Sequence, residues 1–335
     1  MGLIENLFLY IFLIAAFVVV VFCIILHITT QPYPKLWRDE KEKVFFNHKR
    51  KEYQDFPSLY NDWSINLSVI VPAYNEEERR KDYNILSPML DECLKYLEQL
   101  KRSGHSYEVI IVSDGSTDRT VEVAQGYASK YDTVRVLALV KNRAQKRHFI
   151  TQGMLSSRGS ALLFADADGA TRFADLEKLN DSLRNTLGFD YLSKPEDVAL
   201  SHAVICGSRA HLEKEETAKR SFFRLFLMHG FHFLVWFLCV RGIRDTQCGF
   251  KLLTRESARS IFQNLHVERW AFDVEMLYIA KHFNIPVTEV AVNWTEIEGS
   301  KIVPFWSWLQ MGKDLVLIWL RYKIGAWKID DIKEN

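Results

Sequence analysis

The stretch ALLFADADGATRF, residues 161–173, decides the fold class of this chain. An apolar run of strand length ends in two aspartates, Asp166 and Asp168, with one residue between them and a glycine after them. In a β-strand, residues i and i+2 point to the same side, so the two carboxylates would lie close together. Like charges at that distance repel each other unless a cation or hydrogen bonds hold them. The pattern indicates either a cation site at the end of a buried strand or an ordinary Asp-Gly turn.

Strand and helix patterns alternate around this stretch. Apolar, β-branched runs begin at residues 67, 107 and 134, and the segments 88–100 and 120–131 carry apolar residues at helical spacing. Strands that alternate with helices before residue 190 predict βαβ units, and hence an α/β fold with a mostly parallel sheet flanked by helices. Ligands bind at the carboxyl ends of the strands in such sheets. We therefore expect the polar residues that follow three of these strands to converge at one edge.

The N-terminus carries a candidate membrane anchor. No Asp, Glu, Lys or Arg occurs from Asn6 to Leu26, and a helix of that length spans about 30 Å, the thickness of the hydrocarbon core of a bilayer. A cleaved signal peptide is the alternative, but the run exceeds a usual signal core and no Lys or Arg precedes it. Several basic residues follow between Lys35 and Lys51. The positive-inside rule then places everything after residue 30 in the cytosol, behind a single-pass anchor at residues 1–30.

Charge and cysteine content exclude other classes of protein. The chain of 335 residues has 43 Lys and Arg against 42 Asp and Glu, so no overall charge favours nucleic acid as a partner. Its 5 cysteines form no CxxC pair, which is typical of reduced thiols packed inside a protein on the cytosolic side.

Beyond the anchor, the chain is divided at residues 64 and 216. Residues 31–64 are polar and aromatic without periodicity, which predicts a linker. In the last part, 217–335, the segments 221–240 and 303–327 combine aromatic residues with interspersed basic ones. That composition favours amphipathic helices in the membrane interface, and helices buried in the core are the alternative.

The polar clusters that follow these three strands are PAYNEEE, SDGSTD and DAD, and together they suit a nucleotide-sugar donor. A hard cation such as Mg²⁺ or Mn²⁺ takes one or two protein carboxylates, here Asp166 and Asp168, and completes its shell with phosphates and water. The cation would offset the repulsion between the two aspartates and neutralise the donor diphosphate. Asp114 could accept from the base or the ribose of the donor, whereas Asp118, just before a helical pattern, is better explained as a helix cap. In the first cluster, we assign Pro72, Tyr74 and Glu76 to the base pocket.

Several motifs together resemble the inverting glycosyltransferases of the GT-A fold in family 2, and in particular the eukaryotic dolichyl-phosphate β-glucosyltransferases. They are SVIVPAYNEE, SDGSTD, ADADGAT, GSRAHLEKE, RDTQCGFK, VERWAFDVE and VNWTEIEGSKIVPFWSWLQMGKD. The resemblance extends from about residue 67 to residue 327 and includes the preceding single anchor.

The resemblance implies a GT-A (Rossmann-like) fold with a nucleotide-sugar-binding region at 65–216 and an acceptor-binding, membrane-interface region at 217–335. It implies UDP-glucose as donor and dolichyl phosphate as acceptor, with membrane lipids as further partners, at the endoplasmic reticulum membrane. The implied product is dolichyl β-D-glucosyl phosphate for lipid-linked oligosaccharide assembly in N-glycosylation. A dolichyl-phosphate mannosyltransferase that uses GDP-mannose and a non-catalytic membrane scaffold that retained the fold are the alternatives.

A lipid phosphate acceptor requires cations rather than a general base. Its phosphate, with a second pKa of about 6, is mostly dianionic at neutral pH and already nucleophilic. Arg209, Arg220 and Arg224 could hold it, because guanidinium forks match phosphate oxygens. Arg220 and Arg224 are one helical turn apart, and binding to lipid headgroups is their alternative role. Attack opposite the departing UDP would invert the α-linked donor to a β product.

The remaining motif residues are assigned to the pocket or a lid. We expect Asp245 and Gln247 to line the sugar pocket, and Asp168, Arg209 and Asp245 to be the catalytic residues. The expected lid or diphosphate-binding residues are Glu268, Arg269, Trp270 and Asp273, for which a purely structural role is the alternative. In NRAQKRHF, 142–149, Lys146 matches a donor-binding lysine of the family, but Arg147 and His148 stand where relatives have glycines.

Overall fold

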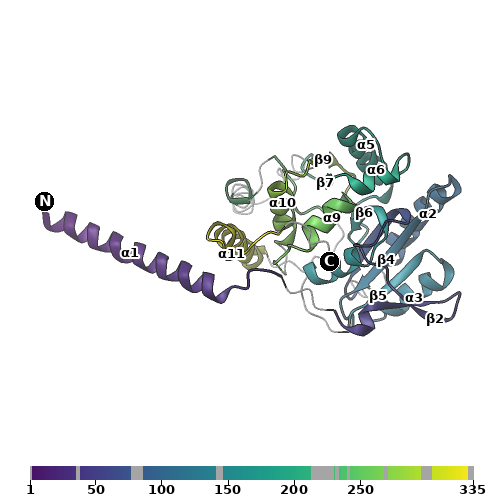
Figure 1. Ribbon diagram of the computed structural model, residues 1–335, viewed down its shortest axis with the longest axis horizontal. Helices are drawn as coiled ribbons and strands as arrows, with labels where there is room; N and C mark the ends of the chain where they lie inside the picture. Colours follow the sequence, from purple (N-terminus) through teal and green to yellow (C-terminus); the bar gives the residue numbers. More distant parts are fainter. Residues whose placement is uncertain are drawn as a thin grey trace.

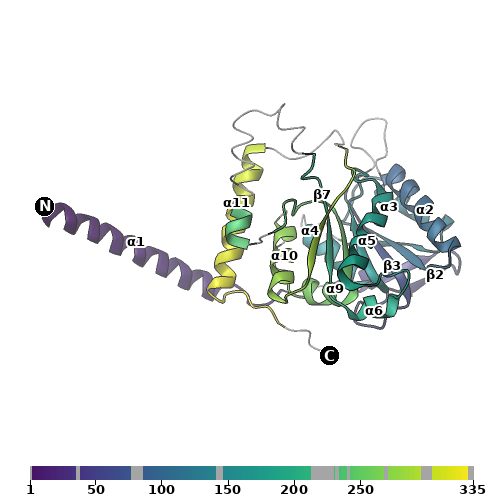
Figure 2. The ribbon, with the colours of Figure 1, turned by 90° about the horizontal axis from the view of Figure 1, so that it is seen from above.

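The computed structural model describes residues 2–34, 38–76, 86–140, 146–212, 230, 234–239, 242–267, 271–295 and 304–330, with the backbone alone for residues 2–5, 146–147 and 304–309. A central sheet carries helices on both faces, and one long helix extends away from them (Figures 1 and 2).

Seven strands form the central sheet, in the order β5-β4-β3-β6-β8-β7-β9. They are β3 (Ile65–Ala73), β4 (Tyr107–Ser113), β5 (Val134–Ala138), β6 (Gly159–Ala165), β7 (Val204–Ser208), β8 (Phe250–Thr254) and β9 (Val287–Ala291). The first four in this order are parallel, and so are β7 and β9, whereas β8 runs antiparallel to both β6 and β7. The expected mostly parallel α/β sheet is thus confirmed.

The helices cover the sheet on its two faces (Figure 2). They are α2 (Leu86–Arg102), α3 (Thr120–Lys130), α4 (Lys146–Leu155), α5 (Leu176–Leu187), α6 (Pro195–Leu200), α9 (Arg255–Phe262) and α10 (Phe272–His282). A further helix, α11 (Pro304–Lys323), lies on the outer side of α10, away from the sheet (Figure 2). Two short 3-10 turns, η1 (Glu40–Lys43) and η2 (Phe173–Asp175), and a π turn, η4 (Val235–Cys239), complete them.

Alternating side chains of the parallel strands fill two hydrophobic cores. On β3, Val69 and Val71 pack in the core beneath α2 and α5, while Ile70 between them packs in the core beneath α4 and α9. A strand covered on both faces requires an unbroken apolar run, which explains why VIV and VIIV could be recognised in the sequence.

Residues 38–64, part of the expected linker, pack against the domain. η1 leads into an antiparallel hairpin of β1 (Val44–Asn47) and β2 (Glu52–Asp55). Phe45, Phe56 and Leu59 are buried in the core that also contains α4 and α9. Most of the segment therefore belongs to the folded domain.

The first helix, α1 (Gly2–Thr29), projects away from the domain and ends beside α11 (Figures 1 and 2). Its 24 residues from Asn6 to Thr29 are long and apolar enough to cross a membrane, and none of that span is buried in the protein. These properties agree with a membrane anchor.

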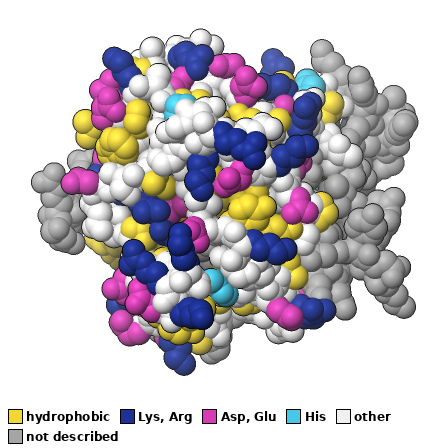
Figure 3. Space-filling model, turned by 90° about the vertical axis from the view of Figure 1, so that its right-hand side faces the viewer, with side chains coloured by type: hydrophobic (Ala, Val, Ile, Leu, Met, Phe, Trp, Pro, Cys, Tyr) yellow, Lys and Arg dark blue, Asp and Glu magenta, His cyan; other side chains and the backbone are white. Residues whose placement is uncertain are grey.

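The two aromatic segments near the C-terminus are described in part. Leu315 and Ile318 of α11 are fully buried, whereas Val316 is exposed. Most of 221–240 lies outside the described residues, and in its described part, η4, Trp236 and Phe237 are exposed. Their place in a membrane interface stays a prediction. On the face of the molecule opposite α1, basic and acidic side chains are interspersed (Figure 3).

Candidate active site

The loops after β3 and β4 meet at the carboxyl edge of the sheet, as expected. Asp114 N donates to Ala73 O over 3.1 Å, and Glu76 N donates to Thr120 Oγ1 over 2.9 Å. The side chains of Glu76 and Asp114 are buried, Tyr74 is half-buried, and Pro72 is buried at the end of β3. Asp118 Oδ1 accepts from Thr120 N over 2.9 Å, but the N-cap position of α3 is Arg119, one residue later, so Asp118 is not the helix N-cap that was expected.

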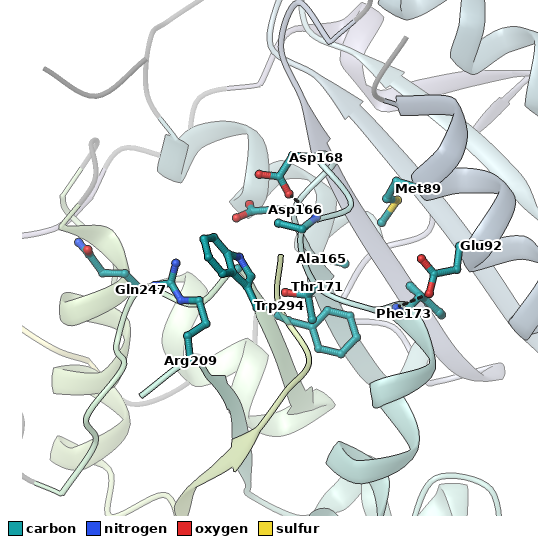
Figure 4. A pocket seen from close by; sticks show the side chains of 13 residues that line it. Met89, Glu92, Ala165, Asp166, Asp168, Thr171, Phe173, Arg209, Gln247 and Trp294 are labelled. Carbon is teal, nitrogen blue, oxygen red and sulfur yellow. Dashed lines mark hydrogen bonds between the residues drawn. The ribbon is translucent and has the colours of Figure 1, made fainter. Parts of the chain in front are cut away.

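Asp166 and Asp168 follow β6 directly. Their carboxyl groups turn to the same side of a pocket, toward Gln247 and Arg209 (Figure 4). Asp168 Oδ1 also accepts from Ala170 N over 3.0 Å, within a turn in which Gly169 has a φ of 68°. The turn and the carboxylate pair thus coexist, because Asp168 closes the turn and still lines the pocket.

This pocket has a volume of about 100 Å³. Residues from five parts of the chain line it, namely Met89, Glu92, Ala165, Asp166, Asp168, Ala170, Thr171, Phe173, Arg209, Gln247, Gly249, Phe250 and Trp294. Within the described part of the chain, no group of three or more His, Cys, Asp or Glu side chains could hold a metal ion. Two half-buried carboxylates on one side of a pocket fit a Mg²⁺ or Mn²⁺ ion that takes its other ligands from phosphate and water.

Arg209, just after β7, is held by Asp245 through two parallel hydrogen bonds. Arg209 Nε donates to Asp245 Oδ2 over 2.7 Å, and Nη2 donates to Oδ1 over 2.9 Å. Burial lowers the pKa of Arg209, but the hydrogen bonds and charge of Asp245 outweigh it and raise that pKa above its usual value. Burial raises the pKa of Asp245, but hydrogen bonds from Arg209 outweigh it and lower that pKa. Both groups therefore remain charged near neutral pH.

Asp245 does not occupy its expected place. It is absent from the described residues that line the pocket, whereas Arg209 and Gln247 are among them. Both of its oxygens accept from Arg209, so Asp245 fixes the direction of this side chain. Its expected catalytic role stays a prediction.

Trp294 lines this side of the pocket and Glu289 supports the loop behind it, and sequence reasoning assigned neither residue a role. The Arg209 guanidinium lies 5.3 Å from the centre of the Trp294 ring, a cation–π distance. Glu289 on β9 accepts from Arg244 N and Asp245 N over 3.1 and 2.8 Å, which fixes the backbone beneath Asp245. Trp294 belongs to a motif that carried the resemblance, whereas an acidic residue on a half-buried strand gave no signal.

Asp273 is also placed differently from the expectation. It is only 3% exposed and accepts from Lys251 Nζ over 2.5 Å. Burial lowers the pKa of Lys251, but the charge of Asp273 outweighs it and raises that pKa. The carboxylate thus neutralises a buried lysine, and it is not among the described pocket residues.

Other expected site residues lie outside the described part of the chain. These are Arg220, Arg224, Glu268, Arg269, Trp270 and the side chain of Lys146. His148, in the first turn of α4, is buried.

A mostly parallel α/β sheet, with paired acids facing an anchored arginine at its carboxyl edge, defines a glycosyltransferase of the GT-A type. Residues 68–262 match the family model described as glycosyl transferase family 2. The chain is 54% identical over 325 residues to the dolichyl-phosphate beta-glucosyltransferase of Homo sapiens, covering 96% of this chain and 95% of the relative. It is 55% identical over 311 residues to that of Drosophila melanogaster, covering 91% and 90%.

Within family 2, the chain belongs to the dolichyl-phosphate beta-glucosyltransferase family. A solved structure supports the fold. Glucosyl-3-phosphoglycerate synthase from Mycobacterium tuberculosis, in complex with Mn²⁺, UDP-glucose and phosphoglyceric acid, superposes with a TM-score of 0.50. At 16% identity over 80% of this chain and 82% of that one, this similarity concerns the fold alone.

Proposed function

We propose that the chain transfers glucose from UDP-glucose to dolichyl phosphate with inversion, giving dolichyl β-D-glucosyl phosphate. One observation carries the proposal: Arg209 and the pair Asp166 and Asp168 line the same pocket, so cationic and anionic groups face each other across it. The names of the relatives at 54% and 55% identity, which match nearly the whole chain, support the transfer of glucose to dolichyl phosphate.

On the donor side, Asp166 and Asp168 would hold a Mg²⁺ or Mn²⁺ ion. Such an ion neutralises the charge that develops on the departing diphosphate. The solved neighbour binds Mn²⁺ together with UDP-glucose, in agreement with this choice. We retain Pro72, Tyr74, Glu76, Asp114 and Lys146 as donor-binding residues.

On the acceptor side, Arg209 would bind the lipid phosphate. Among the described residues, Asp245 accepts from Nε and Nη2 of Arg209, which leaves Nη1 of Arg209 for a phosphate oxygen. Because the phosphate is largely dianionic near neutral pH, no side chain has to remove a proton before attack. What the protein supplies is alignment of the phosphate with the anomeric carbon. Arg220 and Arg224 are proposed as further phosphate ligands.

A membrane setting follows from the acceptor. The apolar α1 is long enough to span a bilayer, and the basic residues after it support a cytosolic position for the catalytic region. We propose the endoplasmic reticulum membrane as its location and lipid-linked oligosaccharide assembly for N-glycosylation as the use of its product.

The test incubates membranes that contain the protein with dolichyl phosphate and either labelled UDP-glucose or labelled GDP-mannose, with and without EDTA. We expect a labelled glucolipid that disappears with the chelator. A mannolipid formed in preference to the glucolipid would assign the donor to GDP-mannose, and no lipid product from either donor would contradict catalysis.

The variant Asp168→Asn is expected to abolish transfer, because an amide is a much weaker cation ligand than a carboxylate. Its amide oxygen can still accept from Ala170 N, so the turn should remain intact. The protein should therefore stay folded and membrane-bound, as judged by flotation and thermal unfolding. Activity equal to the wild type would contradict the metal assignment.

A further inference from the structure

Gly249 lies directly opposite Asp166, at the point where β6 ends and β8 begins. The antiparallel register pairs Ala165 with Phe250, and the next pair along this ladder is Asp166 with Gly249. Asp166 N donates to Gly249 O over 2.9 Å, so the backbone contact continues beyond the two strands. Side chains at directly opposed positions share one face of an antiparallel pair. The carboxyl group of Asp166 therefore lies on the side where a residue at 249 would place its Cβ.

The carboxyl group of Asp166 fills the space that a side chain at position 249 would occupy. A Cβ at position 249 would overlap Oδ2 and Cγ of Asp166 and would lie 2.9 Å from Oδ1. These three atoms are the nearest neighbours of that Cβ, and all belong to one side chain. The φ of Gly249 lies outside the left-handed region, so the backbone conformation is open to other residues. Glycine is needed here for space and not for its conformational freedom.

We propose that Gly249 is a positioning residue that directs the Asp166 carboxylate toward the divalent cation of the donor complex. This inference rests on the proposed function, in which Asp166 and Asp168 hold that cation. A methyl group at 249 would turn the Asp166 carboxylate out of its present place. The side chain can rotate without displacing the backbone, so the cost should fall on cation binding and much less on folding.

The same short loop controls the other side of the pocket. Asp245, four residues before Gly249, binds Arg209, and Gln247 N donates to Asp245 Oδ1 over 3.2 Å. The loop 245–249 thus contacts both the cation ligand and the phosphate ligand. Its fixed geometry would hold the two substrates at a defined separation.

The test compares full-length wild type with Gly249→Ala in detergent. Binding of Mn²⁺ in the presence of UDP is followed by the EPR signal of the free ion, which does not require turnover. Substitution of a residue that orients a metal ligand typically weakens metal binding by about 10-fold to 100-fold. We expect a weakening of that size in Gly249→Ala, with an unfolding temperature close to that of the wild type.

Two other glycines provide matched controls. In Gly153→Ala the new Cβ would lie 2.6 Å from Ile70 Cγ2 and 2.8 Å from Val112 Cγ2, so it overpacks the core away from Asp166. This variant should unfold at a lower temperature and bind Mn²⁺ like the wild type. In Gly126→Ala, within α3, the Cβ would meet nothing within 4 Å, so Mn²⁺ binding should not change. The unfolding temperature should stay the same or rise slightly, because alanine favours a helix more than glycine does.

A double-mutant cycle isolates the contact. Asp166→Ala removes Cγ and both oxygens, so adding Gly249→Ala to it should weaken Mn²⁺ binding no further. Wild-type affinity in Gly249→Ala, or additive losses in the double variant, would overturn the inference. So would a wild type that makes the glucolipid without binding Mn²⁺. If the Mn²⁺ measurements and the double-mutant cycle give the expected results but the wild type forms no glucolipid, the proposed function is contradicted and the proposed role of Gly249 is not.

Discussion

The guanidinium of Arg209 is shared between a fixed partner and an open pocket. Asp245 takes two of its nitrogens, while the Trp294 ring lies 5.3 Å from its central carbon. The direction of the remaining nitrogen is therefore set by two neighbours before any phosphate arrives. A lysine lacks the planar fork that binds both carboxylate oxygens in one fixed geometry, so its ammonium would not hold a donor in a defined direction toward a phosphate.

We accordingly expect Arg209→Lys to lower kcat/KM for dolichyl phosphate by about 100-fold or more, the usual cost of losing one well-placed donor to transition-state charge. Initial rates at varied dolichyl phosphate would measure it. Arg184→Lys is a matched control, because Arg184 also binds an aspartate, Asp190, but lies half exposed and outside the pocket. Equal effects of the two substitutions would contradict the acceptor role of Arg209.

The pH dependence of the reaction should report the acceptor and not this ion pair. The pKa of Asp245 is lowered, so its contribution to stability is complete above the ordinary value of about 4 and is lost only as pH falls further. Between about pH 5 and pH 8 the pair stays charged, and the acid limb of kcat/KM should follow protonation of the lipid phosphate, near about pH 6. A pH profile, with thermal unfolding at each pH as control, checks this. A flat profile through pH 6 would contradict the need for a dianionic nucleophile.

The candidate residues differ in how far the sequence could reveal them. Asp166, Asp168, Arg209 and Gln247 could be selected because their chemistry and motif context suffice. The positioning role of Asp245 could not be selected, because its partner is 36 residues away in the chain. Glu289 is likewise 44 residues from the backbone that it holds. Such pairings depend on which strands become neighbours, and no local pattern encodes that.

Among the strands, the parallel half of the sheet was predictable and the rest was not. β3, β4 and β5 contain apolar, β-branched residues, and β6 is an apolar run of Ala, Leu and Phe, as expected of strands covered on both faces. β8, by contrast, has the fully buried Lys251 as its second residue, and a charged residue there breaks the expected pattern. The lysine is tolerated because Asp273 from α10 neutralises it at 2.5 Å.

This pair leads to a stability prediction for β8 and α10. Asp273→Ala leaves the buried ammonium of Lys251 without its carboxylate, which should cost about 3–5 kcal/mol of unfolding free energy. Chemical denaturation of the purified protein would measure the loss. Adding Lys251→Met removes the charge and should restore much of the stability. A single variant as stable as the wild type, but inactive, would return Asp273 to the lid role first expected for it.

For the molecule as a whole, the segment after the anchor is fastened to the domain at both ends. Near the membrane, Pro32 O accepts from Lys328 N over 3.0 Å and lies 3.1 Å from His266 Nε2, whose ring stacks on Trp327. At the other end, the buried Arg255 donates to Ser58 O and Asn61 O over 3.1 and 2.7 Å. Because these partners lie far away in the sequence, no local pattern in the segment revealed them, and its composition predicted only a linker.

Two truncations separate an anchor from a structural segment. Deleting residues 2–29 should leave a folded protein, because α1 has no side chains buried from Asn6 to Thr29. Deleting residues 2–64 should not, since it removes Phe45, Phe56 and Leu59, each worth about 1.5–3 kcal/mol of apolar burial. It also leaves Arg255 donors unpaired, at about 1–3 kcal/mol. Thermal unfolding and size-exclusion chromatography would compare the two. If the protein without residues 2–64 unfolds at the same temperature as the protein without residues 2–29, residues 31–64 are a tether, as their composition suggests. The packing of the hairpin would then contribute nothing to the stability of the domain.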